Sequence, residues 1–365
     1  MYPLRFREII RSYKFGERWI AEAFPDKKLP STGIIAETWE VCCLNGDCSI
    51  VTNGEFSGKN ISELIATQGC NLLGHRIVQQ FGLNFPLLIK LLDVTHTLGA
   101  HVHPNAIQAR KIGRGNTGKT EAWYMLDVKR DAKIYCGNRK GVTITDVVKA
   151  VQTETVQSCM KEYPVQKGDA FILYTGTMHY SPGGLLFYEI MENSDAGLPL
   201  INPPQTCPVE QKERHFNAIK EIVRIEDDAD VRTFPVVIQE GQNRRIFLFA
   251  CTHFAVERLE LIQPYRLISD QSCFYVLTLI SGICHVETNN YSETLKPGNS
   301  CLLPACLKEV NLIPEGMVSI LKAYVPELIT NIIKPLRAAG VPDKQIALLG
   351  GCSQLNPLPA LLLSV

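Results

Sequence analysis

From residue 85 onward, short hydrophobic runs alternate with turn residues along the chain. Gly, Asn and Asp separate the runs, which lie at 85–92, 120–127, 133–136, 170–174 and 185–190. Many short strands with turn residues between them are typical of an all-β sandwich or barrel. The pattern therefore predicts a β domain, interrupted by a helix over 145–161.

The segment before residue 85 mixes helical and strand patterns. A short helix is predicted around 19–24, and strands are predicted at 37–41 and 48–51. The turn sequence Asn45-Gly46-Asp47 lies between these two strands. A further helix is predicted to begin near residue 60, with Asn60 or Ser62 as its N-cap.

A second strand-rich region follows a segment rich in proline. Residues 201–231 are predicted to be a linker with a helix, and 232–326 a second β domain. The turn Lys296-Pro297-Gly298 and the strand after it echo the pattern of 165–173. The two halves are therefore predicted to be related β-barrels, with a metal in only the first, 1–200. The tail, 327–365, is predicted to be partly helical and then irregular.

The composition is that of an ordinary globular protein. The chain has 365 residues, of which 45% are hydrophobic, so it can bury a sizeable core. Its formal net charge is zero, which argues against a nucleic-acid or membrane partner attracted by bulk charge. No uninterrupted apolar stretch is long enough for a membrane span.

Thirteen cysteines without a repeated spacing bear on the cellular compartment. Their number is odd, and the first seven residues do not resemble the apolar core of a signal peptide. We therefore expect a reduced, cytoplasmic protein with mostly buried free thiols. Cys42, Cys43 and Cys48 lie close together and are a weaker alternative metal site, because no second Cys or His pair has zinc-finger spacing.

The strongest chemical signal is the pair His101 and His103. Side chains at i and i+2 of a strand leave the same face, and two neutral imidazoles there can share a transition metal. Glu121 and His179 follow in strand contexts, at spacings that suit ligands brought together by neighbouring strands. We predict a mixed N/O site that accepts Zn, Fe, Mn, Co or Ni. The alternative is a set of hydrogen-bonded core residues, which is our interpretation of His285.

Several motifs then resemble one known family. The matching stretches include 85–94, 102–105, 118–124, 176–179 and 192–196. In this order they resemble the class I mannose-6-phosphate isomerase family of the cupin superfamily, in its shorter bacterial type. The resemblance implies a mainly β fold, with one metal-binding cupin domain and a second, metal-free cupin-like barrel.

The resemblance also implies an activity and roles for individual residues. The family interconverts mannose 6-phosphate and fructose 6-phosphate through a cis-enediol with bound zinc. It implies metal-ligand roles for His103, Glu121 and His179, and His101 stands where the family often has Gln. Lys119 would contact the substrate near the metal, with a solvated lysine at a loop end as the alternative.

Lys90 matches a family lysine that is associated with the sugar phosphate. A lysine in an interior strand position is costly unless it meets an anion, so pairing with an internal carboxylate is the alternative. The expected partner of the protein is a small sugar phosphate, with neither nucleic acid nor membrane. The chain itself is expected to be a monomer or a homodimer.

One departure from the family leaves other functions open. An arginine that the family uses near the active site is replaced by Pro199, which offers neither charge nor donor. The candidates to take its place in space are Arg110, Arg114, Arg244 and Arg245. The alternatives are a diverged metal cupin that acts on another sugar, and a non-catalytic sugar-binding or regulatory cupin.

Overall fold

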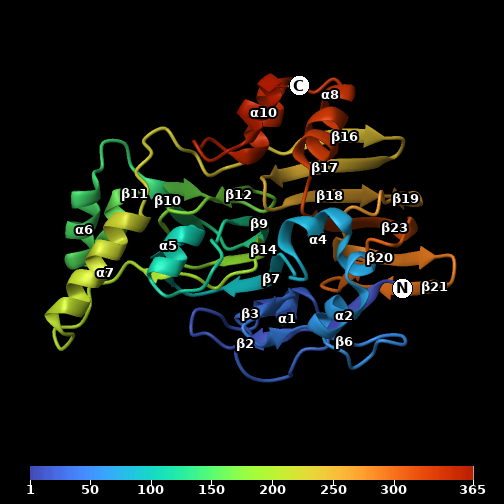
Figure 1. Ribbon diagram of the computed structural model, residues 1–365, viewed down its shortest axis with the longest axis horizontal. Helices are drawn as coiled ribbons and strands as arrows, with labels where there is room; N and C mark the ends of the chain where they lie inside the picture. Colours follow the sequence, from blue (N-terminus) through green and yellow to red (C-terminus); the bar gives the residue numbers. More distant parts are fainter. Residues whose placement is uncertain (365) are drawn as a thin grey trace.

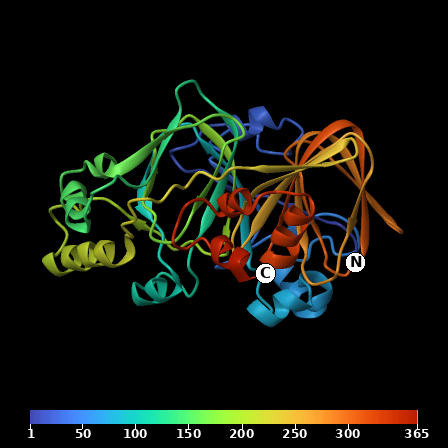
Figure 2. The same cartoon turned by 90° about the horizontal axis from the view of Figure 1, so that it is seen from above.

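The structure is a computed structural model and describes residues 1–364. Strands are the most frequent regular structure in the chain and form two β units that lie next to each other, with most helices at the outside (Figure 1). The prediction of a mainly β protein is confirmed. The view from above shows both units and the C-terminal helices that cross from one to the other (Figure 2).

The first β unit consists of two facing sheets. Its six-stranded sheet contains, in spatial order, β12 (Ala170–Leu173), β9 (Glu121–Val128), β14 (Leu185–Glu192), β7 (Leu87–Val94), β3 (Glu37–Val41) and β2 (Ile9–Arg11). Its five-stranded sheet contains β11 (Met160–Pro164), β10 (Lys133–Asn138), β13 (His179–Ser181), β8 (Leu98–Val102) and β15 (Leu198–Pro199). Aromatic and aliphatic side chains such as Trp123, Phe171 and Phe187 fill the space between the sheets.

The second β unit is a ten-stranded sheet whose long strands bend around their own core. Its main path is β16 (Val236–Glu240), β17 (Asn243–Ala250), β18 (Ala255–Leu261), β23 (Glu309–Tyr324), β20 (Tyr275–Thr288), β22 (Ser300–Leu303), β1 (Leu4–Arg7) and β6 (Ile50–Val51). Two further strands pair at its sides, β19 (Tyr265–Ile268) and β21 (Tyr291–Leu295).

The two units share one strand order. The path β12-β9-β14-β7-β3-β2 corresponds strand by strand to β22-β20-β23-β18-β17-β16, and the strands follow each other along the chain in the same sequence in both. Irregular pairing occurs at matching places, between Trp39 and Val41 on β3 and between Phe247 and Phe249 on β17. The similarity extends to the register, so a residue in one unit has a defined counterpart in the other.

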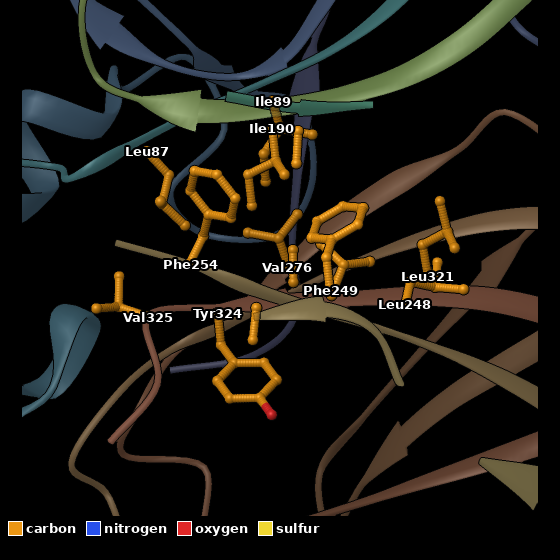
Figure 3. Packing of buried hydrophobic residues seen from close by; sticks show 14 of the residues in the cluster. Leu87, Ile89, Ile190, Leu248, Phe249, Phe254, Val276, Leu321, Tyr324 and Val325 are labelled. Carbon is orange, nitrogen blue, oxygen red and sulfur yellow. The ribbon is translucent and has the colours of Figure 1, made fainter. Parts of the chain in front are cut away.

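The two sheets pack against each other through one large apolar layer. Alternate residues of β7, such as Leu87 and Ile89, point to the second unit, while Lys90 faces the interior of its own unit. Figure 3 shows this layer, in which Phe249 and Phe254 lie opposite the first unit. Each fully buried side chain of this size contributes about 1.5–3 kcal/mol, so this layer holds the units together.

The N-terminal strand belongs to the second unit. Leu4 of β1 pairs with Leu302 of β22, and Phe6 pairs with Val51 of β6. Figure 1 shows the N-terminus beside β21. The chain therefore begins in the second unit, builds the first, and then returns to complete the second.

Helices pack around the two units. They are α1 (Trp19–Ala23), α2 (Ile61–Gln68), α3 (Cys70–Leu73), α4 (His75–Phe81), α5 (Ala106–Lys111), α6 (Ile144–Gln152), α7 (Val209–Ile222), α8 (Lys334–Ala338), α9 (Asp343–Ala347) and α10 (Leu358–Ser364). Asn60 is the N-cap of α2 in a capping box with Glu63, as one of the two predicted caps. Within the predicted linker, α7 packs on α6.

Two predicted segments differ from the structure. The helix predicted over 145–161 ends at Gln152, because Glu154 adopts a positive φ of 58° that a helix does not allow. A short 3-10 turn, Val156–Cys159, leads directly into β11. The tail is not irregular at its end, where α10 packs Leu358 and Leu362 into the core.

Candidate metal centre

Three histidines meet between the two sheets of the first unit. His101 lies on β8, His103 follows its end, and His179 opens β13, directly opposite His101 in the strand pairing. The i, i+2 spacing turns His101 and His103 to one side, as predicted. Glu121 begins β9 in the facing sheet, so it approaches the histidines from across the interior.

The four side chains lie within reach of one ion. One ring nitrogen from each of His101, His103 and His179 lies within 4.8 Å of the others. The Glu121 carboxylate lies 3.2 Å from His103 Nε2 and 3.3 Å from His179 Nε2. His103, Glu121 and His179 are almost completely buried, with exposed fractions of 3%, 1% and 0%.

Backbone carbonyls fix the orientation of all three rings. The Nδ1 atoms of His101, His103 and His179 lie 2.7, 2.9 and 2.9 Å from the carbonyl oxygens of Gly99, Ala196 and Thr177. A carbonyl only accepts, so Nδ1 must carry the proton and Nε2 keeps its lone pair. This is the outer-shell arrangement that orients histidines toward a metal.

The atoms that face the centre lack hydrogen bonds. Among residues 1–364, no hydrogen bond reaches His103 Nε2, His179 Nε2 or either carboxylate oxygen of Glu121, although all four atoms are buried. Buried polar atoms normally have a partner, and an unsatisfied one costs about 1–3 kcal/mol. A divalent cation bound to these lone pairs would satisfy them together, so the residues present fit a metal.

The electrostatics of the centre keep its ligands in the metal-binding form. Burial lowers the pKa of His101 and His179 to about 3 and that of His103 to about 4, so the rings are neutral near neutral pH. Burial opposes ionisation of Glu121, but Lys119 and His103 outweigh it and hold its pKa well below its usual value. Three neutral imidazoles and one carboxylate are the donor set of a borderline transition metal.

Lys119 lies beside the centre and is buried. Its ammonium is 3.2 Å from Glu121 Oε2, and only 8% of the residue is exposed. It is therefore not the solvated loop-end lysine that was the alternative interpretation. Its position places a positive charge next to the carboxylate of the centre.

Lys90 lies deeper in the same interior, between two carboxylates. Its ammonium is 3.3 Å from Glu37 Oε2 and 3.5 Å from Glu189 Oε2, and it lies 5.1 Å from the centre of the Trp39 ring. Burial opposes its charge, but Glu37 and Glu189 outweigh burial and raise its pKa. The internal pairing that was the alternative for Lys90 is thus present in the structure.

Glu37 and Glu189 were not among the residues singled out from the sequence. Both are buried, and Glu189 also accepts a hydrogen bond of 2.9 Å from Trp123 Nε1. Burial, followed by the charge of Glu121, raises the pKa of Glu189 to about 7. The sequence feature that could have identified them is a charged residue on the inward face of an otherwise apolar strand.

Pro199 lies directly beside the centre. On β15 it pairs with His101 of β8, so the position where the resemblance implies an arginine adjoins the three histidines. Arg244 and Arg245 do not compensate, because they lie on β17 of the second unit and bind Glu260 and Glu257. The Arg11 guanidinium lies 4.3 Å from the centre of the Trp39 ring, which Lys90 also contacts.

The cysteines do not form a second centre. Cys43 and Cys48 face each other across the hairpin of β4 (Cys43–Leu44) and β5 (Asp47–Cys48), with Cys42 next to them. Within residues 1–364, only the three histidines form a metal-capable group of three or more such side chains. All cysteines are free thiols, most of them buried or partly buried.

Comparison with known families identifies both β units. Residues 4–138 match the catalytic domain of phosphomannose isomerase type I, and residues 243–325 match the cupin domain of mannose-6-phosphate isomerase. The predicted cupin fold is thereby confirmed. No helix within residues 1–364 is long and apolar enough to cross a membrane.

Individual relatives cover most of the chain. Mannose-6-phosphate isomerase ManA from Bacillus subtilis is 28% identical over 314 residues, which are 85% of this chain and 95% of ManA. Mannose-6-phosphate isomerase from Streptococcus mutans is 30% identical over 284 residues, 74% of this chain and 83% of the relative. The crystal structure of the B. subtilis mannose 6-phosphate isomerase superposes with a TM-score of 0.74, at 22% identity, over 88% of this chain and 99% of that one.

The chain belongs to the mannose-6-phosphate isomerase family, as its motifs indicated. It is an isomerase-like enzyme of the type I class.

Proposed function

We propose that the protein is a metal-dependent aldose–ketose isomerase that interconverts mannose 6-phosphate and fructose 6-phosphate through a cis-enediol. One observation carries the proposal: histidine Nε2 atoms and carboxylate oxygens that lack hydrogen bonds lie close together, beside a buried lysine. Isomerases of this kind must stabilise negative charge on the sugar oxygens as a proton moves between neighbouring carbons. A buried centre with positive charge beside it suits that task.

His101, His103, Glu121 and His179 are the proposed metal ligands. A divalent cation held there would supply Lewis-acid stabilisation of the developing enediolate. The donor set supports zinc, and Mn, Fe, Co or Ni would also fit it. The carbonyl contacts to each Nδ1 hold the rings in place whatever the ion, so the chain itself defines the geometry.

Lys119 is the proposed catalytic residue of the chain. Its ammonium, 3.2 Å from Glu121, is held at the edge of the centre, where it would donate a hydrogen bond to a substrate oxygen. In a buried site such a charge-assisted bond is stronger than in water. It would also favour the anionic form of that oxygen during proton transfer.

Lys90 is the proposed binding residue for the sugar phosphate, and its surroundings define how it would act. Glu37 and Glu189 already pair with the ammonium, so a phosphate would have to compete with two carboxylates. Protonation of Glu189, whose pKa is raised to about 7, would release one of these pairings at neutral pH. Arg11 also contacts the Trp39 ring and is paired with Asp47.

The proposal includes a cytoplasmic location and a monomer or homodimer. The free thiols support a reduced compartment, because secreted proteins usually pair their cysteines.

One assay tests the proposed activity. Purified protein is stripped with a chelator, reloaded with Zn²⁺ or Mn²⁺, and incubated with mannose 6-phosphate while fructose 6-phosphate is detected by a coupled enzyme. We expect turnover only in the reloaded protein, and none with unphosphorylated mannose. Absence of turnover in folded, metal-loaded protein would refute the proposal.

A second candidate is a diverged metal cupin that acts on or senses another sugar. The specific observation in its favour is Pro199 opposite His101, where the family has a charged residue. The same metal-reloaded protein, incubated with other aldose phosphates and free aldoses while the corresponding ketose is detected by NMR, separates the two candidates. Turnover of another sugar at a higher kcat/KM would favour the second.

A further inference from the structure

The second unit has a polar pocket at the place that corresponds to the candidate metal centre. Strand pairing defines the correspondence. Lys90 pairs with Glu189 on one side and with Trp39 on the other, and Glu257 pairs in the same way with Lys322 and Phe247. Glu257 is thus the counterpart of Lys90.

The neighbouring positions follow from the same register. Lys322 takes the place of Glu189, and Arg245, two residues before Phe247, takes the place of Glu37. On the next strand, Tyr275 takes the place of Glu121. The signs of the buried charges are therefore inverted, because a lysine between two glutamates corresponds to a glutamate between an arginine and a lysine.

The side chains that carry the inverted charges contact one another through Glu257. Its carboxylate accepts a hydrogen bond of 2.5 Å from the Tyr324 hydroxyl and 3.1 Å from Arg245 Nη2, and it lies 3.1 Å from Lys322 Nζ. Figure 3 shows the Tyr324 hydroxyl pointing away from the apolar layer between the units. Glu257 is fully buried, and Lys322 is 5% exposed.

One buried carboxylate, that of Glu257, therefore pairs with two cations. The next carboxylate, Glu240, is 3.7 Å from Arg245 and has 34% of its side chain exposed. Lys322 has three donors, and Glu257 is the only carboxylate within 4.0 Å of its ammonium among residues 1–364. Burial lowers the pKa of Lys322, with Glu257 only partly opposing it, whereas the two carboxylates around Lys90 raise the pKa of that lysine.

Arg245, Lys322 and Tyr324, which all contact Glu257, line a cavity of about 200 Å³. Its wall includes Arg245, Arg266 and Lys322 and no carboxylate. Tyr265, Tyr275 and Tyr324 add hydroxyls and ring faces, and the C-terminal tail contributes Thr330 and Asn331 from the π-helical turn Ile329–Ile333. At roughly 30 Å³ per water molecule, the cavity holds on the order of six waters, which suits a small metabolite and not a nucleotide or peptide.

We propose that this pocket is a second ligand site, which binds a small phosphorylated polyol. The cations would meet the phosphate, since Arg and Lys are the usual phosphate-binding residues. Hydroxyl and amide groups both donate and accept, as a polyol requires, and aromatic rings offer an apolar surface for its C–H groups. The site does not depend on the activity proposed for the first unit, because none of its residues comes from that unit.

Calorimetric titration of the full chain with glycerol 3-phosphate tests the proposal. We expect Lys322→Met to weaken binding at least tenfold, and Tyr275→Phe to weaken it a few-fold. The matched control is Arg244→Met, on the same strand as Arg245 but bound to Glu260 and outside the cavity wall, which should bind within twofold of the unmodified protein. Tyr275→Phe removes a single hydroxyl, so this variant tests the site even if the Lys322→Met variant does not fold.

Two further measurements complete the test. Glycerol should not bind, and inorganic phosphate should bind more weakly than glycerol 3-phosphate. Equal affinity for inorganic phosphate and glycerol 3-phosphate would refute the proposal that the pocket recognises the polyol. Crystals soaked in tungstate, a heavy tetrahedral anion, should show an anomalous peak beside Lys322. Unchanged affinity in both pocket variants, or a tungstate peak only in the first unit, would overturn the site.

Discussion

The two β units place different chemistry on the same framework. In the first unit, Lys90 lies between two carboxylates and three histidines meet nearby; in the second, Glu257 lies between two cations and Tyr275 stands where Glu121 would be. Strand order, register and the irregular pairing on β3 and β17 are shared. The shared backbone therefore places buried charged groups at corresponding positions in both units, and the side chains at these positions differ in charge and chemistry.

Charge inversion also shows what a buried charge requires in such a fold. In each unit a central charged side chain pairs with a side chain of opposite charge on each neighbouring strand. The arrangement of the pairs is the same in both units, although every charge has the opposite sign. Breaking a buried pair is costly because it leaves an uncompensated charge. The comparison can be tested by removing corresponding residues from each unit.

The largest expected effect is the loss of the metal centre in His103→Ala. We expect metal affinity to fall by more than the tenfold to hundredfold typical of an outer-shell change. The kcat/KM for mannose 6-phosphate should fall by at least about a thousandfold, because oxyanion stabilisation is lost. Metal analysis and the coupled assay measure both.

The matched control for this change is His285→Ala. His285 lies in the second unit, where it contacts Thr294 and Glu315 and no metal-capable group. It should keep metal content and activity. Equal metal loss in the two variants, or none in either, would contradict the assignment of the centre to the first unit.

Next in size is a difference in stability between Glu257→Gln and Glu189→Gln. The first change leaves Arg245 and Lys322 without their shared buried anion and should lower the free energy of unfolding by about 3–5 kcal/mol. The second leaves Lys90 paired with Glu37, so we expect a loss of roughly 1–2 kcal/mol. Urea unfolding measures both, and equal losses would show that the two groups are not organised as described.

The same glutamate should make the second unit sensitive to acid. Burial opposes ionisation of Glu257, but Lys322 and Arg245 outweigh it and lower its pKa from 4.5 to about 2. Its stabilising contribution is therefore present above pH 4.5 and is lost as the pH falls toward 2. The contribution is about 3 kcal/mol by linkage.

Unfolding experiments between pH 5 and pH 2 check this dependence. The difference in stability between the unmodified protein and Glu257→Gln should shrink as the pH falls, because the unfolded chain binds a proton at this carboxylate at a higher pH than the folded protein does. A difference that stays constant over this range would argue against the lowered pKa.

The smallest effect expected here is that of Lys119→Met on turnover. The change removes the positive charge beside Glu121 but none of the proposed ligands, so kcat should fall about a hundredfold while metal content stays the same. Lys111→Met, an exposed lysine paired with Glu221, is the control and should leave kcat unchanged. Parallel loss of metal in Lys119→Met would indicate a role in assembling the centre instead.

Much of the first unit was predictable because its signals are local. Alternating apolar residues define the strands, and the i, i+2 spacing of His101 and His103 places both rings on one side. The Asn60 cap was visible as a polar residue before an apolar run, with Glu63 three positions later. Each of these features depends on residues close together in the sequence.

The remainder depends on pairings between distant strands. Nothing near Lys90 in the sequence indicates Glu37 or Glu189, because the sheet alone brings them together. The pocket of the second unit has no motif, since its walls come from separate strands and from the tail. The early end of α6 follows from the backbone of Glu154, a residue that rarely adopts a positive φ.

The pairing of β1 with β22 has a consequence for the synthesis of the chain on the ribosome. Leu4 is made before its partner Leu302, which emerges only after the whole first unit and most of the second. Until then one side of β1 has no strand to pair with, and open strand edges invite association with other chains. The newly made protein should therefore depend on chaperones until Leu302 is released, and a fragment that stops before β22 should aggregate even though it contains every proposed metal ligand.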